Sequence, residues 1–201
     1  MFYETETNDH GLAHDPFKAI VAPRPIGWIG TLSEDGVRNL GPYSFFNAVS
    51  DRPKLVMFSS SGGAKDSATN AERTGEFTCS FVSRNLVEAM NISSAAVPPE
   101  TDEFALAGLT ATPGRLVRAP YVGEAYAALE CRVTEILQPK TLAGDPSSSV
   151  IVFGQVVAIH IREEVIREGR FDVALARPVT RMGYMDYSEV GEIFEMMRPT
   201  V

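Results

Sequence analysis

The chain has 201 residues, of which 44% are hydrophobic and 22% charged, an ordinary composition for one folded domain. Its formal net charge of −8 argues against a nucleic-acid surface, because phosphate backbones are held mainly by clusters of Lys and Arg. The sequence has no apolar run of the roughly 18–20 residues that a membrane helix needs. Residues 1–6 are polar and lack the features of a signal peptide, so we expect a cytoplasmic protein.

The first half of the chain predicts short strands and one helix. Residues 20–32 are apolar and lead into a turn at Ser33–Gly36, which predicts a hairpin. A buried strand is expected over Leu55–Ser59 and is followed by a polar, glycine-bearing stretch. A short helix over Lys65–Arg73 then precedes the alternating strand Glu76–Val82.

The second half predicts two longer strands between short helices. A helix is expected over Leu86–Ile92, followed by a polar loop over Ser93–Glu103. The strands are Ala125–Leu137 and Val150–Arg162, the second of which is rich in the β-branched residues that sheets prefer. A last short helix is expected over Gly169–Ala176.

These elements predict one strand-dominated domain over residues 1–201, with extensions at 1–16 and 188–201. Cys79 and Cys131 each lie in an alternating apolar pattern, without a CxxC pair or a nearby acid–base partner. We therefore expect both to be buried strand residues and not redox-active thiols.

Several familiar motifs are incomplete or absent. The stretch before Ser67 lacks the first glycine of a phosphate loop, and Lys65 is not directly followed by Ser or Thr. Neither GxGxxG nor GxSxG occurs. His10 and His14 are four residues apart but lack a carboxylate-rich partner segment, so no metal site is expected. His160 alternates with Ile159 and its apolar neighbours and is interpreted as a structural or surface residue.

A dense set of small polar residues flanks the predicted strands. A phosphate is best held by hydroxyls, by backbone amides at a helix N-terminus and by a cation, and Ser59–Ser67 offers all three. The alternative is a plain loop with Asp66 or Ser67 as a helix cap. The members of the set are Thr31, Asn39–Phe46, Ser59–Ser61 and Lys65–Asn70.

Several motifs occur in an order that resembles the flavin reductase-like family with an FMN-binding split barrel. They are Ala22–Thr31, Asp35–Gly36, Asn39–Phe46, Lys65–Ser67 with Asn70, Thr74–Phe77, Val152–Val156, and Pro178–Gly183 with Tyr187. The resemblance extends from about Phe17 over most of the chain. It implies a mainly β fold, a six-stranded antiparallel Greek-key split barrel with short peripheral helices. It also implies a homodimer with one FMN at each of two sites along the interface.

The resemblance further assigns parts of the FMN site. Along the isoalloxazine ring it places Asn39, Leu40, Gly41, Pro42, Tyr43, Ser44 and Phe45. At the ribityl phosphate it places Ser59, Ser60, Ser61, Lys65 and Ser67, and it adds Asp66 and Asn70 to the cofactor-binding residues. It also implies that Thr31 approaches the ring or the ribityl chain.

Two arginines and one tyrosine are further candidates. Arg181, from the same subunit or across the dimer, and Arg24 could place a cation near the ring, where it would stabilise charge that develops on reduction. An ordinary ion pair explains Arg24 almost equally well and Arg181 less well. Related sequences often have Gly where this chain has Tyr184, whose side chain could narrow the space above the ring and orient a second substrate.

The leading functional hypothesis is an NAD(P)H-dependent flavin reductase, in which hydride passes from nicotinamide to flavin and then to an acceptor. The acceptor could be a redox partner protein or a monooxygenase. The protein would orient the two rings and exclude water, and it needs no catalytic acid or base. The second hypothesis is an FMN-bound electron-transfer protein without nicotinamide turnover. The third is a split-barrel interaction module with a vestigial pocket.

Overall fold

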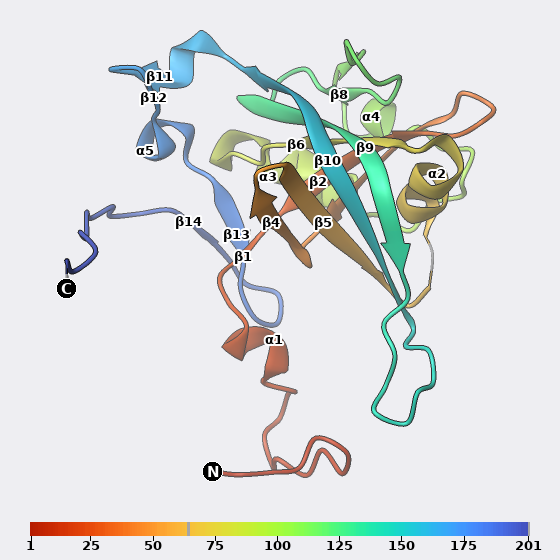
Figure 1. Ribbon diagram of the computed structural model, residues 1–201, viewed down its shortest axis with the longest axis vertical. Coiled ribbons are helices and arrows are strands. Elements are labelled where there is room, and N and C mark those ends of the chain that lie inside the picture. Colours follow the sequence, from red (N-terminus) through yellow and green to blue (C-terminus); the bar gives the residue numbers. More distant parts are fainter. Residues whose placement is uncertain (64, 201) are drawn as a thin grey trace.

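The computed structural model describes residues 1–63 and 65–200, and its largest sheet has seven antiparallel strands (Figure 1). In sheet order, the strands are β3 (Arg38–Tyr43), β2 (Gly27–Leu32), β6 (Glu76–Ser80), β9 (Ala127–Leu137), β10 (Ser149–Ile161), β5 (Lys54–Ser61) and β4 (Phe46–Asp51). The helices around the sheet are short. The predicted mainly β fold with short peripheral helices is therefore confirmed.

The two edge strands of this sheet, β3 and β4, follow one another in the chain and are separated only by Ser44 and Phe45. The sheet must therefore curl until its edges meet at this bend. The amide of Ser59, in β5, donates to the Phe45 carbonyl (2.8 Å) and holds the bend beside β5. The sheet has seven strands instead of the expected six. The bend divides this part of the chain into two separate strands, β3, which pairs with β2, and β4, which pairs with β5.

The connections around the barrel follow a Greek key. After β5, helix α2 (Asp66–Thr74) carries the chain back across the barrel, so that β6 pairs with the side of β2 that β3 leaves free. Gly75 ends the helix in the left-handed conformation (φ +71°), which glycine adopts at little steric cost. The predicted helix over Lys65–Arg73 and the strand that follows it are confirmed to within one or two residues.

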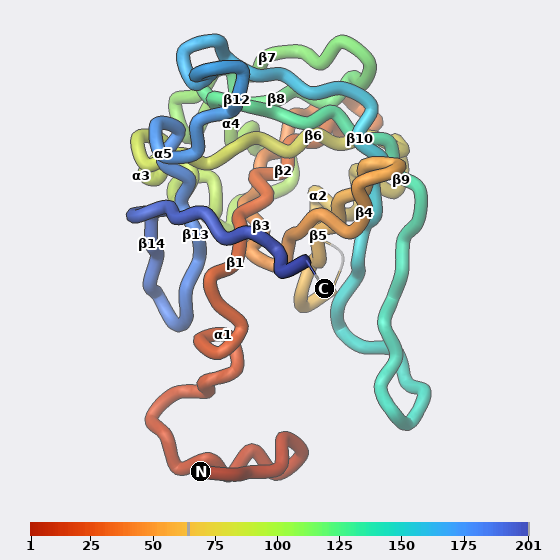
Figure 2. The backbone as a smooth tube through the Cα atoms, turned by 60° about the vertical axis from the view of Figure 1, so that its left-hand side comes forward, coloured from red at the N-terminus to blue at the C-terminus, as the bar shows by residue number. Residues whose placement is uncertain are grey.

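Smaller elements lie around the barrel, and the N-terminal segment with α1 extends away from it (Figure 2). The helices are α1 (Phe17–Ile20), η1 (Arg84–Leu86), α3 (Val87–Ile92), α4 (Glu103–Leu106), η2 (Glu163–Val165) and α5 (Val173–Ala176). The strands are β1 (Arg24–Pro25) with β13 (Val179–Arg181) and β14 (Tyr187–Glu189), β7 (Ala111–Thr112) with β8 (Tyr121–Val122), and β11 (Ile166–Arg167) with β12 (Arg170–Phe171). None of the described helices is long and apolar enough to span a bilayer.

The last helix is shorter than expected from Gly169–Ala176. Residues 170–171 pair in a two-stranded ladder as β12, and α5 begins only at Val173. Asp172 sets this start, because its carboxylate accepts a hydrogen bond from the Leu175 amide (2.9 Å).

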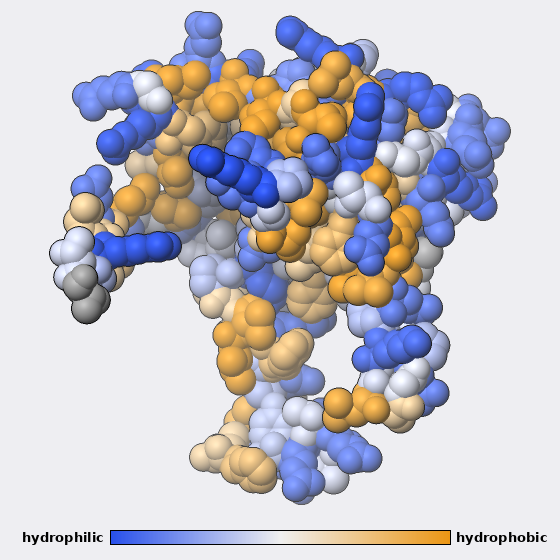
Figure 3. Space-filling view, viewed as in Figure 1, coloured by the Kyte–Doolittle hydropathy of each residue, from blue (hydrophilic) through white to orange (hydrophobic). Residues whose placement is uncertain are grey.

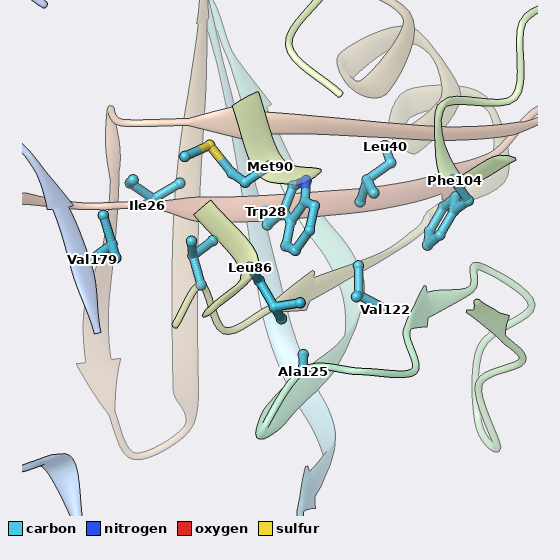
Figure 4. Close-up of a cluster of buried hydrophobic side chains, with 10 residues drawn as sticks. Ile26, Trp28, Leu40, Leu86, Met90, Phe104, Val122, Ala125 and Val179 are labelled. Atoms are coloured by element: carbon cyan, nitrogen blue, oxygen red, sulfur yellow. The ribbon is translucent and has the colours of Figure 1, made fainter. Parts of the chain in front are cut away.

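Strand β2 is buried on both faces, which explains why its sequence does not alternate between apolar and polar residues. Ile29 faces the barrel interior and packs in a cluster with Phe77. Trp28 points the other way, into a second cluster with Phe104 that α3 and α4 cover (Figure 4). The Trp28 indole donates to the Ser93 hydroxyl (2.9 Å) and so fixes the loop that follows α3.

The two cysteines lie in the barrel interior, as the alternating pattern predicts. Both are free and buried, Cys79 in β6 and Cys131 in β9. Burial raises the pKa of the Cys79 thiol to about 12 and that of Cys131 well above its ordinary value. A neutral thiol is a poor nucleophile, so burial and the raised pKa support a structural role for both residues.

A buried carboxylate ties a loop to the barrel. Glu130, in β9, accepts hydrogen bonds from the amides of Arg115 (2.8 Å), Leu116 (2.6 Å) and Val117 (2.9 Å), and pairs with the His160 imidazole (2.5 Å). Burial alone would raise its pKa, but these hydrogen bonds outweigh burial and lower it to about 2. His160 is thus a structural residue, as its place in the alternating strand predicts.

Replacing Glu130 with Gln should reduce stability most at neutral pH. A folded-state pKa below the ordinary 4.5 means that the carboxylate contributes stability above pH 4.5, which is lost as the pH falls toward 2. The NH₂ group of Gln would also face backbone N–H groups, which cannot accept its hydrogen bonds. We therefore expect Glu130→Gln to lower the free energy of unfolding by about 2 kcal/mol at pH 7. Urea unfolding between pH 2.5 and 7 measures this, and the difference from the native protein should shrink in acid.

Glu124→Gln is the matched control, because Glu124 also accepts a hydrogen bond from a backbone amide, that of Thr110 (3.0 Å), but is partly exposed. It should change the free energy of unfolding much less. An equal loss of stability in both variants would contradict the assigned role of Glu130.

Candidate functional site

A polar cavity of about 490 Å³ opens beside the bend between β3 and β4, within the size range of small-molecule sites. Strand β3 forms one wall, the end of β5 and the start of α2 form another, and the loop after α3 borders the opening. The lining residues are Lys18, Asn39–Phe45, Ser59, Ser61, Lys65–Ser67, Ser93–Val97 and Glu103. The predicted ring segment and most of the predicted phosphate segment therefore lie in one cavity.

One end of the cavity is suited to an anion. Ser59 and Ser61 contribute hydroxyls, Lys65 contributes an exposed ammonium group, and α2 begins directly after it. The first amides of a helix have no partner within the helix, and the helix dipole adds partial positive charge there. Asp66 lies in the first turn and is the one opposing charge at this end of the lining.

Ser60 supports the anion end from behind. Side chains of a strand alternate between faces, so Ser59 and Ser61 face the cavity while Ser60 is fully buried with the core side of β5. The Ser60 hydroxyl donates to the Gly63 carbonyl (2.7 Å) and accepts from the Lys65 amide (3.3 Å). Ser60 is thus placed to shape the loop and not to line the cavity.

A buried hydrogen-bond network lies under the β3 wall and centres on Asn39. The Asn39 amide nitrogen donates to Glu103 (2.9 Å), and its oxygen accepts from the hydroxyls of Ser67 (2.7 Å) and Thr31 (3.2 Å). The Asn70 amide donates to the Thr31 hydroxyl (3.2 Å). Thr31 and Asn70, both predicted as cofactor-binding residues, therefore lie behind the lining and position residues that form it.

Glu103 was not identified from the sequence, yet its side chain is almost fully buried at the cavity. One carboxylate oxygen accepts from Asn39, and the other accepts from the Leu40 backbone amide (3.1 Å). Burial raises the pKa of Glu103, hydrogen bonds lower it, and the charge of Asp66 raises it further. Burial likewise raises the pKa of Tyr43. Its hydrogen bonds with Ser67 and Ser60 lower that pKa, but the effect of burial is larger.

Arg24 lies beside the cavity without lining it. Its guanidinium donates to the backbone carbonyls of Lys18, Val21 (2.7 Å) and Met182 (2.7 Å), and its central carbon lies 5.8 Å from the Phe45 ring centroid. Burial, and then the charge of Arg181, lower its pKa. In this chain, Arg24 ties the segment before β1 to the segment after β13.

Arg181 and Tyr184 also lie outside the lining. Arg181 pairs across the strands with Arg24, donates to the Tyr184 carbonyl, and lies 4.4 Å from the Tyr187 ring centroid. Tyr184 has a positive φ of 53°, in the region that favours glycine, and its side chain is about half exposed. Arg181 ends β13 and Tyr184 lies in the turn between β13 and β14, and neither residue lines the cavity.

Three parts of the lining were missed at the sequence level: Lys18, the loop Ser93–Val97 and Glu103. Asp102 caps the start of α4, because its carboxylate accepts a hydrogen bond from the Ala105 amide (3.2 Å). A capping residue can indicate from the sequence where a helix starts, but not that the helix lies beside the cavity. Among residues 1–63 and 65–200, no group of three or more His, Cys, Asp or Glu side chains could hold a metal ion.

Comparisons with known proteins agree with this geometry. A family model described as "Flavin reductase like domain" matches residues 21–180. An uncharacterized protein of Halalkalibacterium halodurans is 36% identical over 185 residues, which cover 90% of this chain and 88% of that protein.

Two solved structures are similar over most of their length. Nitrilotriacetate monooxygenase component B from Bacillus cereus has a TM-score of 0.89 and 28% identity, covering 98% of each chain. Flavoredoxin of Desulfovibrio vulgaris (Miyazaki F) has a TM-score of 0.76 and 26% identity, covering 87% of this chain and 90% of that one. The fold, the polar cavity and the matched residues together show that this chain belongs to the flavin reductase-like family and is a flavin-related oxidoreductase.

Proposed function

We propose that the cavity binds FMN and that the protein uses it to take hydride from NADH or NADPH. The observation that carries this proposal is the cavity itself. It joins an anion-binding end, made by Ser59, Ser61, Lys65 and the start of α2, to a wall formed by the edge strand β3. A flat ring attached to a phosphate needs both parts, and the family supports a flavin.

The residues present suit each part of FMN. An edge strand has backbone N–H and C=O groups that no ladder uses, and these can satisfy the polar edge of a ring. Tyr43 and Phe45 supply aromatic surface on the same wall, and the hydroxyls and ammonium group at the other end suit a dianionic phosphate. Bound FMN would supply the hydride-accepting chemistry, and the protein would bind it, orient it and limit the access of water.

A second candidate function is electron transfer by bound FMN without nicotinamide turnover. One of the similar structures is a flavoredoxin, and the residues that form the cavity account for flavin binding without assigning a nicotinamide pocket. The similarity to a monooxygenase component B instead favours a flavin reductase that serves a monooxygenase. Both candidates share the same FMN site and differ in the electron donor.

We also propose that the protein is a homodimer. Two apolar grooves, with volumes of about 230 and 430 Å³, lie along the sheet, and Leu129 lines both. Val49, Ile159 and Ile161 are each between 45% and 48% exposed on strands β4 and β10. Figure 3 shows apolar residues gathered over much of the molecule in the orientation of Figure 1. Exposed apolar surface of this kind is typical of a face that a partner covers.

The first experiment is anaerobic mixing of the purified protein with FMN and NADH or NADPH. The nicotinamide reductase proposal predicts bleaching of the flavin absorbance near 450 nm, faster than in a protein-free control, because the two rings are oriented on the protein. Unchanged absorbance with both nicotinamides, together with reversible reduction by dithionite, would instead support the electron carrier.

Lys65→Ala should weaken FMN binding by about 1–3 kcal/mol, because it removes a charge-assisted hydrogen bond to the phosphate. Fluorescence titration of the apoprotein with FMN measures the dissociation constant. Lys140→Ala is the matched control, since Lys140 is also an exposed loop lysine but lies outside the cavity lining. Equal affinities in the native protein and Lys65→Ala would place the phosphate elsewhere.

Sedimentation velocity should give a mass of twice the 21.9 kDa of one chain. Ile159→Asp should shift the protein toward the monomer, because it places a charge on the apolar face without disturbing the core. Leu142→Asp, a fully exposed residue in the β9–β10 loop, should leave the mass unchanged. A monomeric native protein at micromolar concentration would contradict the dimer.

A further inference from the structure

The segment that follows β14 carries an amphipathic pattern over residues 192–198. Apolar residues at positions i, i+3 and i+4 lie on one face of an α-helix, and here Glu192 and Glu195 fall on the opposite face. Pro199 would end such a helix, because proline disfavours the helical conformation of the residue before it. The four apolar side chains, called the apolar quartet below, are Ile193, Phe194, Met196 and Met197.

These residues form irregular coil in a single chain, and the quartet faces solvent. The exposed fraction rises from 52% for Ile193 to 75% for Phe194 and 88% for Met197. Among the residues that the structure describes, the last backbone hydrogen bond runs from the Val190 amide to the Pro178 carbonyl (3.1 Å), and the chain then leads away from the barrel (Figure 1). A helix of one or two turns is unstable in water unless its apolar face packs against another surface.

A groove with matching chemistry lies beside β13, the strand that pairs with β14. It has a volume of about 230 Å³, and the described residues that line it include no charged side chain. Phe46, Phe81 and Leu129 give it large apolar surfaces, and Pro178–Thr180 line it at β13. The groove therefore has room for one or two large apolar side chains.

The contacts of the segment favour the groove of a second copy over that of its own. In its own copy, Glu195 lies beside Arg170 of β12 (4.0 Å between Oε1 and Nη1), and β12 is outside the groove lining. Leu129 also lines the second apolar groove, which includes Ile159, so the receiving groove is continuous with the face proposed to form the dimer. A two-fold axis gives both copies the same surfaces, so the segments can be exchanged reciprocally.

We propose that residues 192–198 of each copy fold into a helical turn and bury the apolar quartet in the 230 Å³ groove of a second copy. The acidic residues Glu192 and Glu195 then remain at the surface. Burial of the quartet offsets the entropy lost when the segment becomes ordered. This inference rests on the proposed homodimer, and it adds an exchanged segment on each side to the contact between the two barrels.

Phe194→Asp should weaken the dimer, because it places a charge on the face that enters the groove. We expect its dissociation constant to rise about tenfold or more, as for one large apolar side chain removed from a buried site. Sedimentation velocity over a concentration series measures the constant. Thr200→Asp is the matched control, since it adds the same charge to the same segment outside the quartet, and it should leave the constant unchanged. Equal constants in the native protein and Phe194→Asp would overturn the inference.

Exchange between copies is tested by mixing Phe194→Asp with a variant whose groove is blocked. Ala127 lines the groove, and Ala127→Glu fills it with a charged side chain. Neither variant alone can form an intact contact between segment and groove. A mixed dimer can form one, because the Ala127→Glu copy supplies a native segment and the Phe194→Asp copy supplies an open groove.

Hydrogen–deuterium exchange with mass spectrometry follows residues 192–198 of each copy separately, because Phe194→Asp changes the mass of its own peptide. The native segment should exchange rapidly in Ala127→Glu alone and more slowly after mixing. Native mass spectrometry verifies that mixed dimers form. Mixed dimers without slower exchange would overturn the inference, as would equal protection of the segment in the native dimer and in monomeric Ile159→Asp, which would place it on its own copy.

Where circular dichroism shows that Ala127→Glu does not fold, Pro25→Glu replaces it, because Pro25 lines the same groove and is exposed. A native dimer whose segment exchanges freely would overturn the inference and leave the homodimer intact. A native protein that is monomeric would refute the dimer and the exchanged segment together. Titration with FMN is independent of both results and tests the cavity alone.

Discussion

The Asn39 side chain links strand β3 to its ladder neighbour β2 and to two helices that lie outside the sheet. Through it and its hydrogen-bond partners, strand β3 is tied to Thr31 in β2, to Ser67 in α2 and to Glu103 in α4. All of these side chains are buried, and buried polar groups are costly unless every partner is in place. The helices at the cavity therefore have a fixed position relative to the barrel.

The cavity follows from how the barrel closes. Because β3 and β4 are the two edges of the sheet and only two residues separate them, closure occurs at one bend and leaves the edge of β3 without a neighbouring strand beyond it. The serines at the end of β5 and the start of α2 lie across from this edge. A site built this way can combine backbone groups, hydroxyls and a helix N-terminus without any catalytic acid or base.

The charges around the cavity differ between its parts. Lys65 and the start of α2 make one end positive, although the chain as a whole carries a net charge of −8. Glu103 places a carboxylate at the β3 wall, where burial raises its pKa. Opposite charges in different parts of one cavity favour a ligand whose negative group lies at the positive end and whose hydrogen-bond donors lie at the negative end, and they orient it as well as hold it.

The sequence by itself determined strands β2, β5, β6, β9 and β10, helix α2 and the two segments that meet at the cavity. Alternation, turn chemistry and helix caps are local properties, and the order of several motifs identified the family. The alternating patterns also predicted correctly that Cys79 and Cys131 are buried strand residues, and they assigned His160 a structural or surface position.

Only the tertiary structure decided which side chains face the cavity. Asn39 and Glu103 are 64 positions apart in the chain, and no local pattern links residues at that separation. Arg24 and Arg181 belong to matched motifs, yet their guanidinium groups donate hydrogen bonds to backbone carbonyls of the chain. The direction of a side chain depends on how distant elements pack, and packing is a property of the whole fold.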